Sequence, residues 1–198
     1  STTSTFNRPY SIAVSLLGDI YVGESGNKKI RKIDTFGNVS TLAPDITFGD
    51  PNGIAVDSSG NVFVAEHGTH TIRKIDNSGN VTVYAGVTGM TGNSNGVRTE
   101  ATFNNPRGMA FDSVGNLFIA DTSNHLIRKI NLSGNVTTIA GSGNSGSTDG
   151  PALSAKFNSP MGLLVDSLGI IYVADTGGRK IRKIDLSQNV TTIAGSGS

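Results

Sequence analysis

The tetrapeptide Ile-Arg-Lys-Ile occurs four times in this chain of 198 residues, and this repetition constrains the fold more than any other feature. The copies begin at Ile30, Ile72, Ile127 and Ile181. A Phe-x-x-Pro step precedes each copy, with its proline at Pro9, Pro51, Pro106 and Pro160. The prolines are 42, 55 and 54 residues apart, which is in the range of the repeats that form the blades of β-propellers. We infer a chain built from four copies of one unit.

Each unit is predicted to form four short strands joined by tight turns. In the second unit, residues 53–57, 61–66, 71–76 and 81–84 are short segments rich in apolar and β-branched residues. The tight turns share the pattern Asp-x-x-Gly-Asn, in which the glycine supplies a positive φ. Gln188 stands where the matching turns carry this glycine, and we expect the turn there to be strained or of another type.

The alternation of residues within a strand indicates that both faces of each sheet are apolar. Val62 and Val64 point to one face of their strand, and Phe63 and Ala65 point to the other. The sheet therefore needs a cover on both sides. No stretch of the chain has the 3.6-residue apolar period and the caps of an amphipathic helix, so the cover must be further copies of the same sheet.

This reasoning predicts an all-β fold, a β-propeller of four four-stranded antiparallel blades in a single domain over residues 1–198. The blades are expected at about residues 6–47, 48–102, 103–156 and 157–198. Long loops at 86–102 and 141–156 favour a propeller over a stacked β-solenoid. In a propeller the chain must cross from the outer strand of one blade to the inner strand of the next.

The third unit resembles the NHL repeat family of β-propellers. It begins with Phe-x-x-Pro-x-Gly at residues 103–108, has the turn Asp112-x-x-Gly115-Asn116, and carries the family's namesake tripeptide as Asn124-His125-Leu126. The resemblance covers nearly the whole chain and implies a propeller, with functions that range over protein docking, RNA binding and a metal-using lyase. NHL propellers usually have more than four blades. We therefore expect the ring to close on its own, to be completed by a second chain, or to continue head-to-tail as a filament.

Every predicted second strand ends in a carboxylate, and every predicted third strand carries an arginine. The acids are Glu24, Glu66, Asp121 and Asp175, and the arginines are Arg31, Arg73, Arg128 and Arg182. We interpret them as structural ion pairs within or between blades, because a motif repeated in every blade answers a need that every blade has. The alternative interpretation is a ring of acids that holds a cation or a sugar.

The sequence carries no recognisable catalytic motif. There is no G-x-S-x-G step, no H-E-x-x-H and no phosphate-binding Gly-Lys-Ser/Thr. The three histidines, His67, His70 and His125, are enough for a zinc site, but their spacing does not demand one. We therefore expect no catalytic residue, no metal and no cofactor. A metal-dependent propeller enzyme of the lyase or lactonase type is the alternative.

Composition bears on partners and location. Only 16% of the residues are charged and the formal net charge is +1, so there is no global field that would attract nucleic acid. No apolar stretch is long enough to span a bilayer, and cysteine is absent. We expect no nucleic-acid binding and no membrane insertion. The abundance of Ser, Thr, Asn and Gly favours an extracellular or cell-surface location.

Recognition residues are expected in the loops, because the loops differ between units while the strands do not. The binding residues predicted on this basis are His67, Thr69, His70, Met90, Asn93, Asn95, Arg98, Asn124, His125, Asn144, Asp149 and Arg179. The sequence thus favours a non-enzymatic propeller scaffold or binding module. It would present its loops to a protein or glycan partner, or self-assemble through its end blades.

Overall fold

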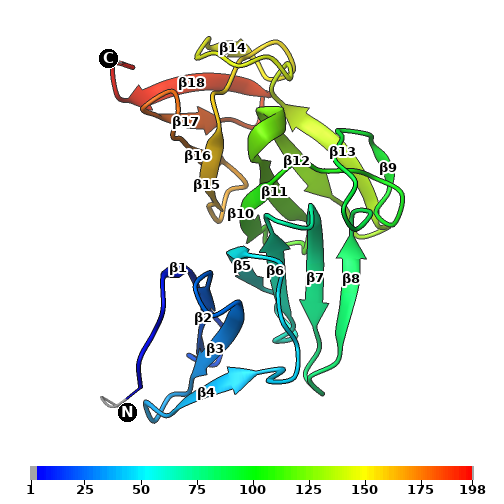
Figure 1. Cartoon of the computed structure of the whole chain (residues 1–198). Helices are drawn as coiled ribbons and strands as arrows, with labels where there is room; N and C mark the ends of the chain where they lie inside the picture. Colours follow the sequence, from blue (N-terminus) through cyan, green and yellow to red (C-terminus); the bar gives the residue numbers. More distant parts are fainter. Residues whose placement is uncertain (1–3, 198) are drawn as a thin grey trace.

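The computed structural model describes residues 4–197, which form four antiparallel sheets in chain order (Figure 1). Blade 1 consists of β1 (Pro9–Val14), β2 (Ile20–Glu24), β3 (Lys29–Ile33) and β4 (Val39–Leu42). Blade 2 consists of β5 (Pro51–Val56), β6 (Val62–Glu66), β7 (Thr71–Ile75) and β8 (Val81–Ala85). Blade 3 consists of β10 (Pro106–Phe111), β11 (Leu117–Asp121), β12 (Leu126–Ile130) and β13 (Asn135–Ala140). Blade 4 consists of β15 (Pro160–Val165), β16 (Ile171–Asp175), β17 (Lys180–Ile184) and β18 (Asn189–Ala194).

The all-β propeller architecture predicted from the repeats is confirmed, with four blades of antiparallel strands. Helical structure in the described residues is limited to a short 3₁₀ turn, η1 (Thr122–Asn124). Across residues 4–197 we find no helix with the length and apolar character that crossing a membrane requires.

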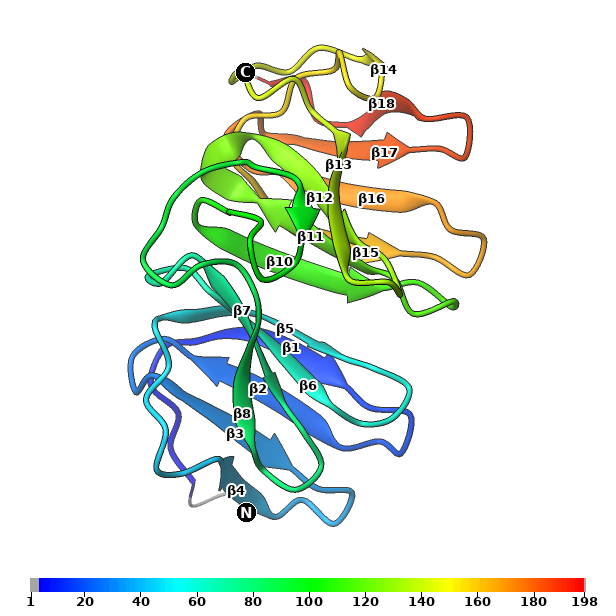
Figure 2. The same cartoon turned by 90° about the vertical axis from the view of Figure 1, so that its right-hand side faces the viewer.

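The two long loops each add a short strand to the sheet that follows them (Figure 2). β9 (Gly96–Val97) pairs with β13, and β14 (Gly150–Pro151) pairs with β18. The sheets of blades 3 and 4 therefore have five strands, one more than the repeat pattern predicts. Each long loop thus covers part of an outer edge strand, whose backbone groups would otherwise lack partners within the sheet.

The tight turns are held by aspartate side chains, as the Asp57 turn illustrates. The Asp57 carboxylate accepts the Asn61 backbone N–H at 2.8 Å, and Gly60 adopts a φ of 84° while its N–H donates to the Asp57 carbonyl at 3.0 Å. Gln188 makes the same hydrogen bond to the Asp185 carbonyl, at 2.9 Å. The expectation of another turn type was therefore wrong. Gln188 still adopts a left-handed φ of 58°, which is unfavourable for a residue with a Cβ.

The apolar cores lie at the joints between blades. Where blades 2 and 3 meet, Phe63 and Ile72 from blade 2 belong to one buried cluster with Ile119 and Ile130 from blade 3. Clusters of the same kind lie at the joint of blades 1 and 2 and at the joint of blades 3 and 4. The two middle sheets thus have both apolar faces covered by sister sheets, as the alternation of residues predicts.

The inner strands line a common axis, and the blades form an open arc around it (Figures 1 and 2). β1 packs beside β5, β5 beside β10, and β10 beside β15. Within residues 4–197, blade 4 makes no comparable contact with blade 1. Two sheet faces are therefore left uncovered by residues 4–197. We call them the end faces: the side of blade 1 turned away from blade 2, and the side of blade 4 turned away from blade 3.

One repeat position on the inner strand is glycine in blades 2, 3 and 4 and Ser11 in blade 1, and in blades 2 and 3 the next inner strand leaves no room for a Cβ there. A Cβ on Gly108 would overlap with the backbone of Met161 in the next blade, whereas a Cβ on Gly162 would meet only the Ala174 methyl group, at 3.6 Å. We expect Gly108→Ala to destabilise the chain by about 1–3 kcal/mol, and Gly162→Ala to change its stability by less than about 0.5 kcal/mol. Urea unfolding at submicromolar concentration compares the two variants. Equal losses of unfolding free energy in the two variants would contradict the inference that contact with the next inner strand excludes a Cβ at Gly108.

The turns should weaken in acid. Burial raises the pKa of Asp112, but hydrogen bonds from the Asn116 side chain and from the backbone of Asn116, Gly115 and Val114 outweigh burial, so this pKa lies below its ordinary value. Stability from such a group is present above the ordinary pKa of 3.8 and is lost as the pH falls through the folded-state pKa. We expect Asp112→Asn, which copies Asn131 at the matching position of another turn, to reduce the pH dependence of the unfolding free energy below about pH 4. An unchanged dependence in urea unfolding would contradict this.

Candidate functional site

The acid and the arginine of each repeat meet beneath the loops that follow the second and fourth strands, an end of the arc that we call the loop end. In blade 3, Arg128 Nη1 donates to Asp121 at 2.8 Å, and neither side chain is exposed. The Asp121 carboxylate also accepts the Asn104 backbone N–H and the Asn124 side-chain amide, each at 2.8 Å. The Arg128 guanidinium lies over the Phe103 ring, 5.3 Å from its centre. The pair thus connects two strands, a loop and a core phenylalanine.

The same pair is present in every blade but is buried to different degrees. The separations are 3.2 Å for Arg31 and Glu24, 3.5 Å for Arg73 and Glu66, 2.8 Å for Arg128 and Asp121, and 3.0 Å for Arg182 and Asp175. The arginine side chain is 26% exposed in blade 2 and fully buried in blades 3 and 4. The long loops account for the difference, because Asn95 accepts a hydrogen bond from Arg128 and Asp149 accepts one from Arg182.

Two of the histidines predicted as binding residues connect neighbouring blades. His70 Nδ1 accepts the Asn105 backbone N–H at 3.1 Å, across the joint of blades 2 and 3. His125 Nδ1 accepts the Ser159 backbone N–H at 3.0 Å, across the joint of blades 3 and 4. One ring nitrogen of each histidine is therefore engaged in holding the arc together.

His67 lies apart from these two contacts. Its Nδ1 is 3.9 Å from the Asp50 carboxylate. Burial, and next to it the charge of Arg107, lower the pKa of His67 below its ordinary value of 6.5, so its ring is uncharged at neutral pH. In the part of the chain that the structure describes, no group of three or more His, Cys, Asp or Glu side chains is placed to hold a metal ion.

Other predicted binding residues are engaged by side-chain hydrogen bonds to neighbouring strands of the chain. Arg98, for example, donates to the Tyr84 carbonyl at 2.7 Å and lies 4.5 Å from the centre of the Tyr84 ring. The residues with such side-chain hydrogen bonds are Thr69, Asn95, Arg98, Asn124 and Asp149. The residues that remain at the exposed surface are Met90, Asn93, Asn144 and Arg179. A binding role for either set stays a prediction.

Four residues near the axis were missed by the sequence analysis. They follow the proline of each Phe-x-x-Pro step and are Tyr10, Asn52, Arg107 and Met161. Arg107 contacts the Tyr10 hydroxyl, and its Nη1 lies 3.8 Å from the Met161 sulfur. The signal was available, because this position carries a different residue in every blade while the proline before it is constant.

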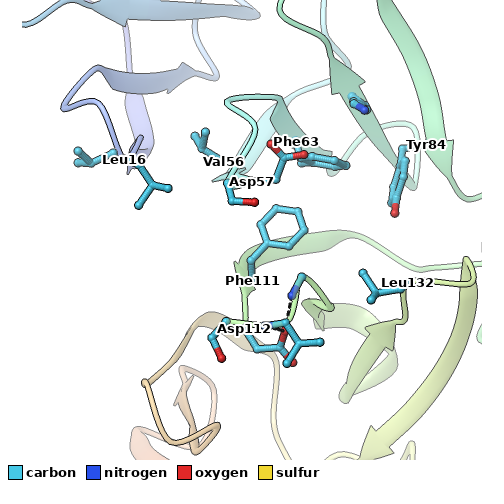
Figure 3. A pocket seen from close by; sticks show the side chains of 14 residues that line it. Leu16, Val56, Asp57, Phe63, Tyr84, Phe111, Asp112 and Leu132 are labelled. Atoms are coloured by element: carbon cyan, nitrogen blue, oxygen red, sulfur yellow. Dashed lines mark hydrogen bonds between the residues drawn. The ribbon is translucent and has the colours of Figure 1, made fainter.

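A cavity of about 590 Å³ lies at the opposite end of the arc, where the tight turns are, an end that we call the turn end (Figure 3). Phe63 and Tyr84 from blade 2 and Phe111 from blade 3 line this cavity, which we call the aromatic pocket. The Phe63 ring meets the other two edge to face, with ring centres 4.8 and 5.0 Å apart. The volume is in the range of pockets that bind ligands.

The three rings meet at this joint and not at the other two joints of the described chain. The position of Tyr84 is occupied in the other blades by Leu42, Ile139 and Ile193. The position of Phe111 is occupied by Val14, Val56 and Val165. The aromatic pocket is therefore a property of one joint rather than of the repeat. Sequence reasoning missed it, although two aromatic residues at otherwise aliphatic repeat positions were a visible signal.

Large apolar side chains are exposed around the aromatic pocket and at other turns of this end. Leu16, Val114 and Leu132 line the pocket and are exposed. Further exposed apolar residues in the turns are Leu17, Phe36, Leu168 and Leu186. The turns do not require apolar residues at these positions, since blade 2 has Ser58, Ser59, Asn77 and Ser78 there. Exposed apolar surface of this kind often marks an interaction site.

Six of the fourteen residues that line the aromatic pocket have polar side chains: Asp57, Ser58, Lys74, Tyr84, Asp112 and Ser113. The Lys74 ammonium lies 5.8 Å from the centre of the Phe63 ring. Asp57 and Asp112 also line the pocket, but their carboxylates accept three and four hydrogen bonds from their own turns. Burial raises the pKa of Tyr84, against the opposing effect of a nearby arginine, so its hydroxyl stays protonated at neutral pH.

Comparison with known proteins identifies the repeat. The NHL repeat model matches residues 48–75 and 103–130, which contain the first three strands of blades 2 and 3. NHL repeat-containing protein 2 of Gallus gallus is 46% identical over 82 residues, which are 41% of this chain and 11% of that protein. An auxiliary nutrient binding protein of Bacteroides thetaiotaomicron has a TM-score of 0.73 and 22% identity, covering 93% of this chain and 48% of the other. Streptogramin B lyase has a TM-score of 0.69 and 15% identity, covering 98% and 57%.

The chain therefore carries NHL repeats at residues 48–75 and 103–130 and is similar to NHL repeat proteins over the parts that match. The likeness to the two solved structures shows the fold alone, because the identities are 22% and 15%. The chain spans about half the length of these structures and about a tenth of the curated relative that it matches.

Removal of a buried arginine should destabilise the chain more than removal of an exposed one. Arg128→Met leaves the Asp121 carboxylate buried without its charged partner. We expect this variant to lose about 3–5 kcal/mol of unfolding free energy. Arg73→Met should lose about 1–2 kcal/mol, because solvent reaches this pair and two threonine hydroxyls still donate to Glu66. Urea unfolding at pH 7 measures both variants. Similar losses of unfolding free energy in the two variants would mean that the long loop does not determine how much the ion pair contributes to stability.

Proposed function

We propose that the chain is a non-enzymatic binding module that docks a protein partner at its turn end, with one apolar side chain of the partner in the aromatic pocket. The observation that carries this proposal is the meeting of three aromatic rings at one joint, beside exposed leucine and valine side chains. The other joints form with aliphatic residues at two of these positions, so the fold itself does not require the added rings.

The energetics of burial favour docking at this place. Leu16, Val114 and Leu132 are exposed to water, and full burial of such a side chain contributes about 1.5–3 kcal/mol. Interfaces concentrate their binding energy in pockets that are surrounded by residues able to exclude water. Lys74 adds a hydrogen-bond donor at the pocket for a carbonyl or carboxylate group of the partner.

A protein partner fits the aromatic pocket better than a glycan does. Sugar hydroxyls need free hydrogen-bond acceptors, and the Asp57 and Asp112 carboxylates already accept hydrogen bonds from their own turns. Protein docking is also among the functions that the NHL family implies.

The loop end, opposite the aromatic pocket, is a second exposed region of the chain. Met90, Asn93, Asn144 and Arg179 are exposed there and differ from the residues at matching positions in other blades. We place the module in an extracellular or cell-surface setting, on the ground of its sequence rich in Ser, Thr, Asn and Gly.

A metal-dependent enzyme of the lyase or lactonase type is the second candidate function, because a lyase is among the solved propellers of similar fold. Such an enzyme would need a group of His, Asp or Glu side chains to hold its metal, and residues 4–197 contain no group of three or more. Metal analysis of the purified chain tests this alternative. One equivalent of tightly held metal per chain would favour the enzyme over the binding module.

A neutral mimic of an aromatic side chain tests the aromatic pocket. N-acetyl-tryptophanamide should shift the NMR signals of the residues that line the pocket, with a dissociation constant of about 1 mM, as expected of so small a ligand. Tyr84→Leu combined with Phe111→Val installs residues found in other blades and should weaken binding roughly fivefold or more, about 1 kcal/mol. Ile139→Val, at the position of Tyr84 in blade 3, is the control and should leave binding unchanged.

Methyl β-glucopyranoside in the same titration separates a glycan from a protein partner. The proposal expects no saturable shift with the sugar. Binding of the sugar without binding of the amide would overturn the protein assignment. Shifts by the amide that persist in the double variant would overturn the assignment of the site.

A further inference from the structure

Each joint between blades buries one phenylalanine from a Phe-x-x-Pro step. The exposed fractions are 1% for Phe48, 0% for Phe103 and 0% for Phe157. At the joint of blades 3 and 4, Phe157 belongs to one buried cluster with Ala120, Ile127 and Ala140 of blade 3. The small alanine side chains leave the space that the ring fills.

Blade 4 has the same site on its end face, without a phenylalanine in it. Ala174, Ile181 and Ala194 occupy the repeat positions of the three blade 3 residues just described. Together with Gly195 they line a hollow of about 260 Å³. Ile181 is 40% exposed, whereas its counterpart Ile127 is fully buried. We call these four residues of blade 4 the phenylalanine site.

Blade 1 carries a phenylalanine on its own end face. Phe6 is 38% exposed, although its counterparts in the other blades are buried. The Arg31 guanidinium lies 5.4 Å from the centre of the Phe6 ring, as Arg182 lies 5.1 Å from the centre of the Phe157 ring. The ring is thus already held in the manner of its buried counterparts. Ile12 beside it is 67% exposed, while its counterpart in blade 2 is buried.

The polar groups of the two end faces also match. At the joint of blades 3 and 4, Thr122 Oγ1 donates to the Pro160 carbonyl at 2.7 Å. Thr176 occupies the same repeat position in blade 4, and within residues 4–197 its hydroxyl contacts only the Ala174 carbonyl, at 3.4 Å. Pro9 has the repeat position of Pro160. The Pro9 carbonyl of an added blade 1 would therefore complete this hydrogen bond.

We propose that the end face of blade 1 docks on the end face of blade 4 in a second copy of this chain, with Phe6 in the phenylalanine site. Both halves of the joint are present on one chain, and they reproduce the contacts by which the chain already joins its own blades. The contact is heterologous, so either two copies close into a ring or many copies continue as a filament. This inference concerns the end faces and does not depend on the partner site at the turn end.

Two arginines would face each other across the new joint. Arg8 and Arg179 occupy the repeat positions of Asn105 and His70, which are joined by a hydrogen bond at the joint of blades 2 and 3. Like charges repel and salt screens them, so assembly should strengthen between low and moderate salt. Arg179→His removes one charge and supplies an acceptor for the Arg8 N–H. It should tighten assembly and abolish the salt effect.

Sedimentation velocity of the full chain tests the proposal. Over about 1–100 µM, species heavier than the 20.5 kDa single chain should increase with concentration. Phe6→Ala and Gly162→Ala should each weaken assembly about tenfold or more. Gly162→Ala is the sharper variant, because a Cβ there meets only one methyl group in the single chain. In the proposed joint it would overlap with the neighbouring inner strand, as a Cβ on Gly108 would within the chain.

Controls separate loss of the joint from loss of the fold and from contact at another surface. Urea unfolding at submicromolar concentration should show that Gly162→Ala and Phe6→Ala remain folded, and Met90→Ala at the loop end should leave assembly unchanged. A chain that keeps the mass of one copy at 100 µM would overturn the proposal. Assembly that survives Gly162→Ala but is lost with Tyr84→Leu and Phe111→Val would also overturn it, because the copies would then meet at the turn end.

Discussion

The packing of one sheet, apolar on both faces, against the next is the interaction on which the rest of this structure depends. Such sheets can bury their strands only by stacking as blades around an axis, and the three core clusters all lie at joints between blades. The inner strands then approach so closely that Gly53 and Gly108 have no room for a Cβ. The loops and the turns are left at the two ends of the arc, where most of the remaining chemistry is found.

The loop end shows that variation between repeats can serve the fold. Asn95 and Asp149 stand in loops that blade 1 and blade 2 lack in this form, and both accept hydrogen bonds from arginines of the buried ion pairs. His70 and His125 each accept a backbone N–H from the next blade. These differences between blades have a structural explanation, so variability alone is weak support for a recognition site.

Two surfaces carry apolar groups that the single chain leaves exposed, and they arise in opposite ways. The aromatic pocket exists because Tyr84 and Phe111 depart from the repeat at one joint. On the end faces, Phe6 and the phenylalanine site of blade 4 keep to the repeat where residues 4–197 place no neighbouring blade. The aromatic pocket, which departs from the repeat, is found at one joint. The end faces, which follow the repeat, have the shape that a second copy of the chain can match.

The sequence by itself determined the blades, their strands and the approximate positions of their turns, because alternation and turn residues are local properties of the chain. It did not predict β9 and β14, whose pairing depends on hydrogen bonds between a loop and the next blade. The aromatic pocket was also decided by the tertiary structure, since Phe63 and Phe111 meet only across a joint. The same holds for the open arc, because the angle between neighbouring sheets is set by side-chain packing at the joints and leaves no local pattern in the sequence.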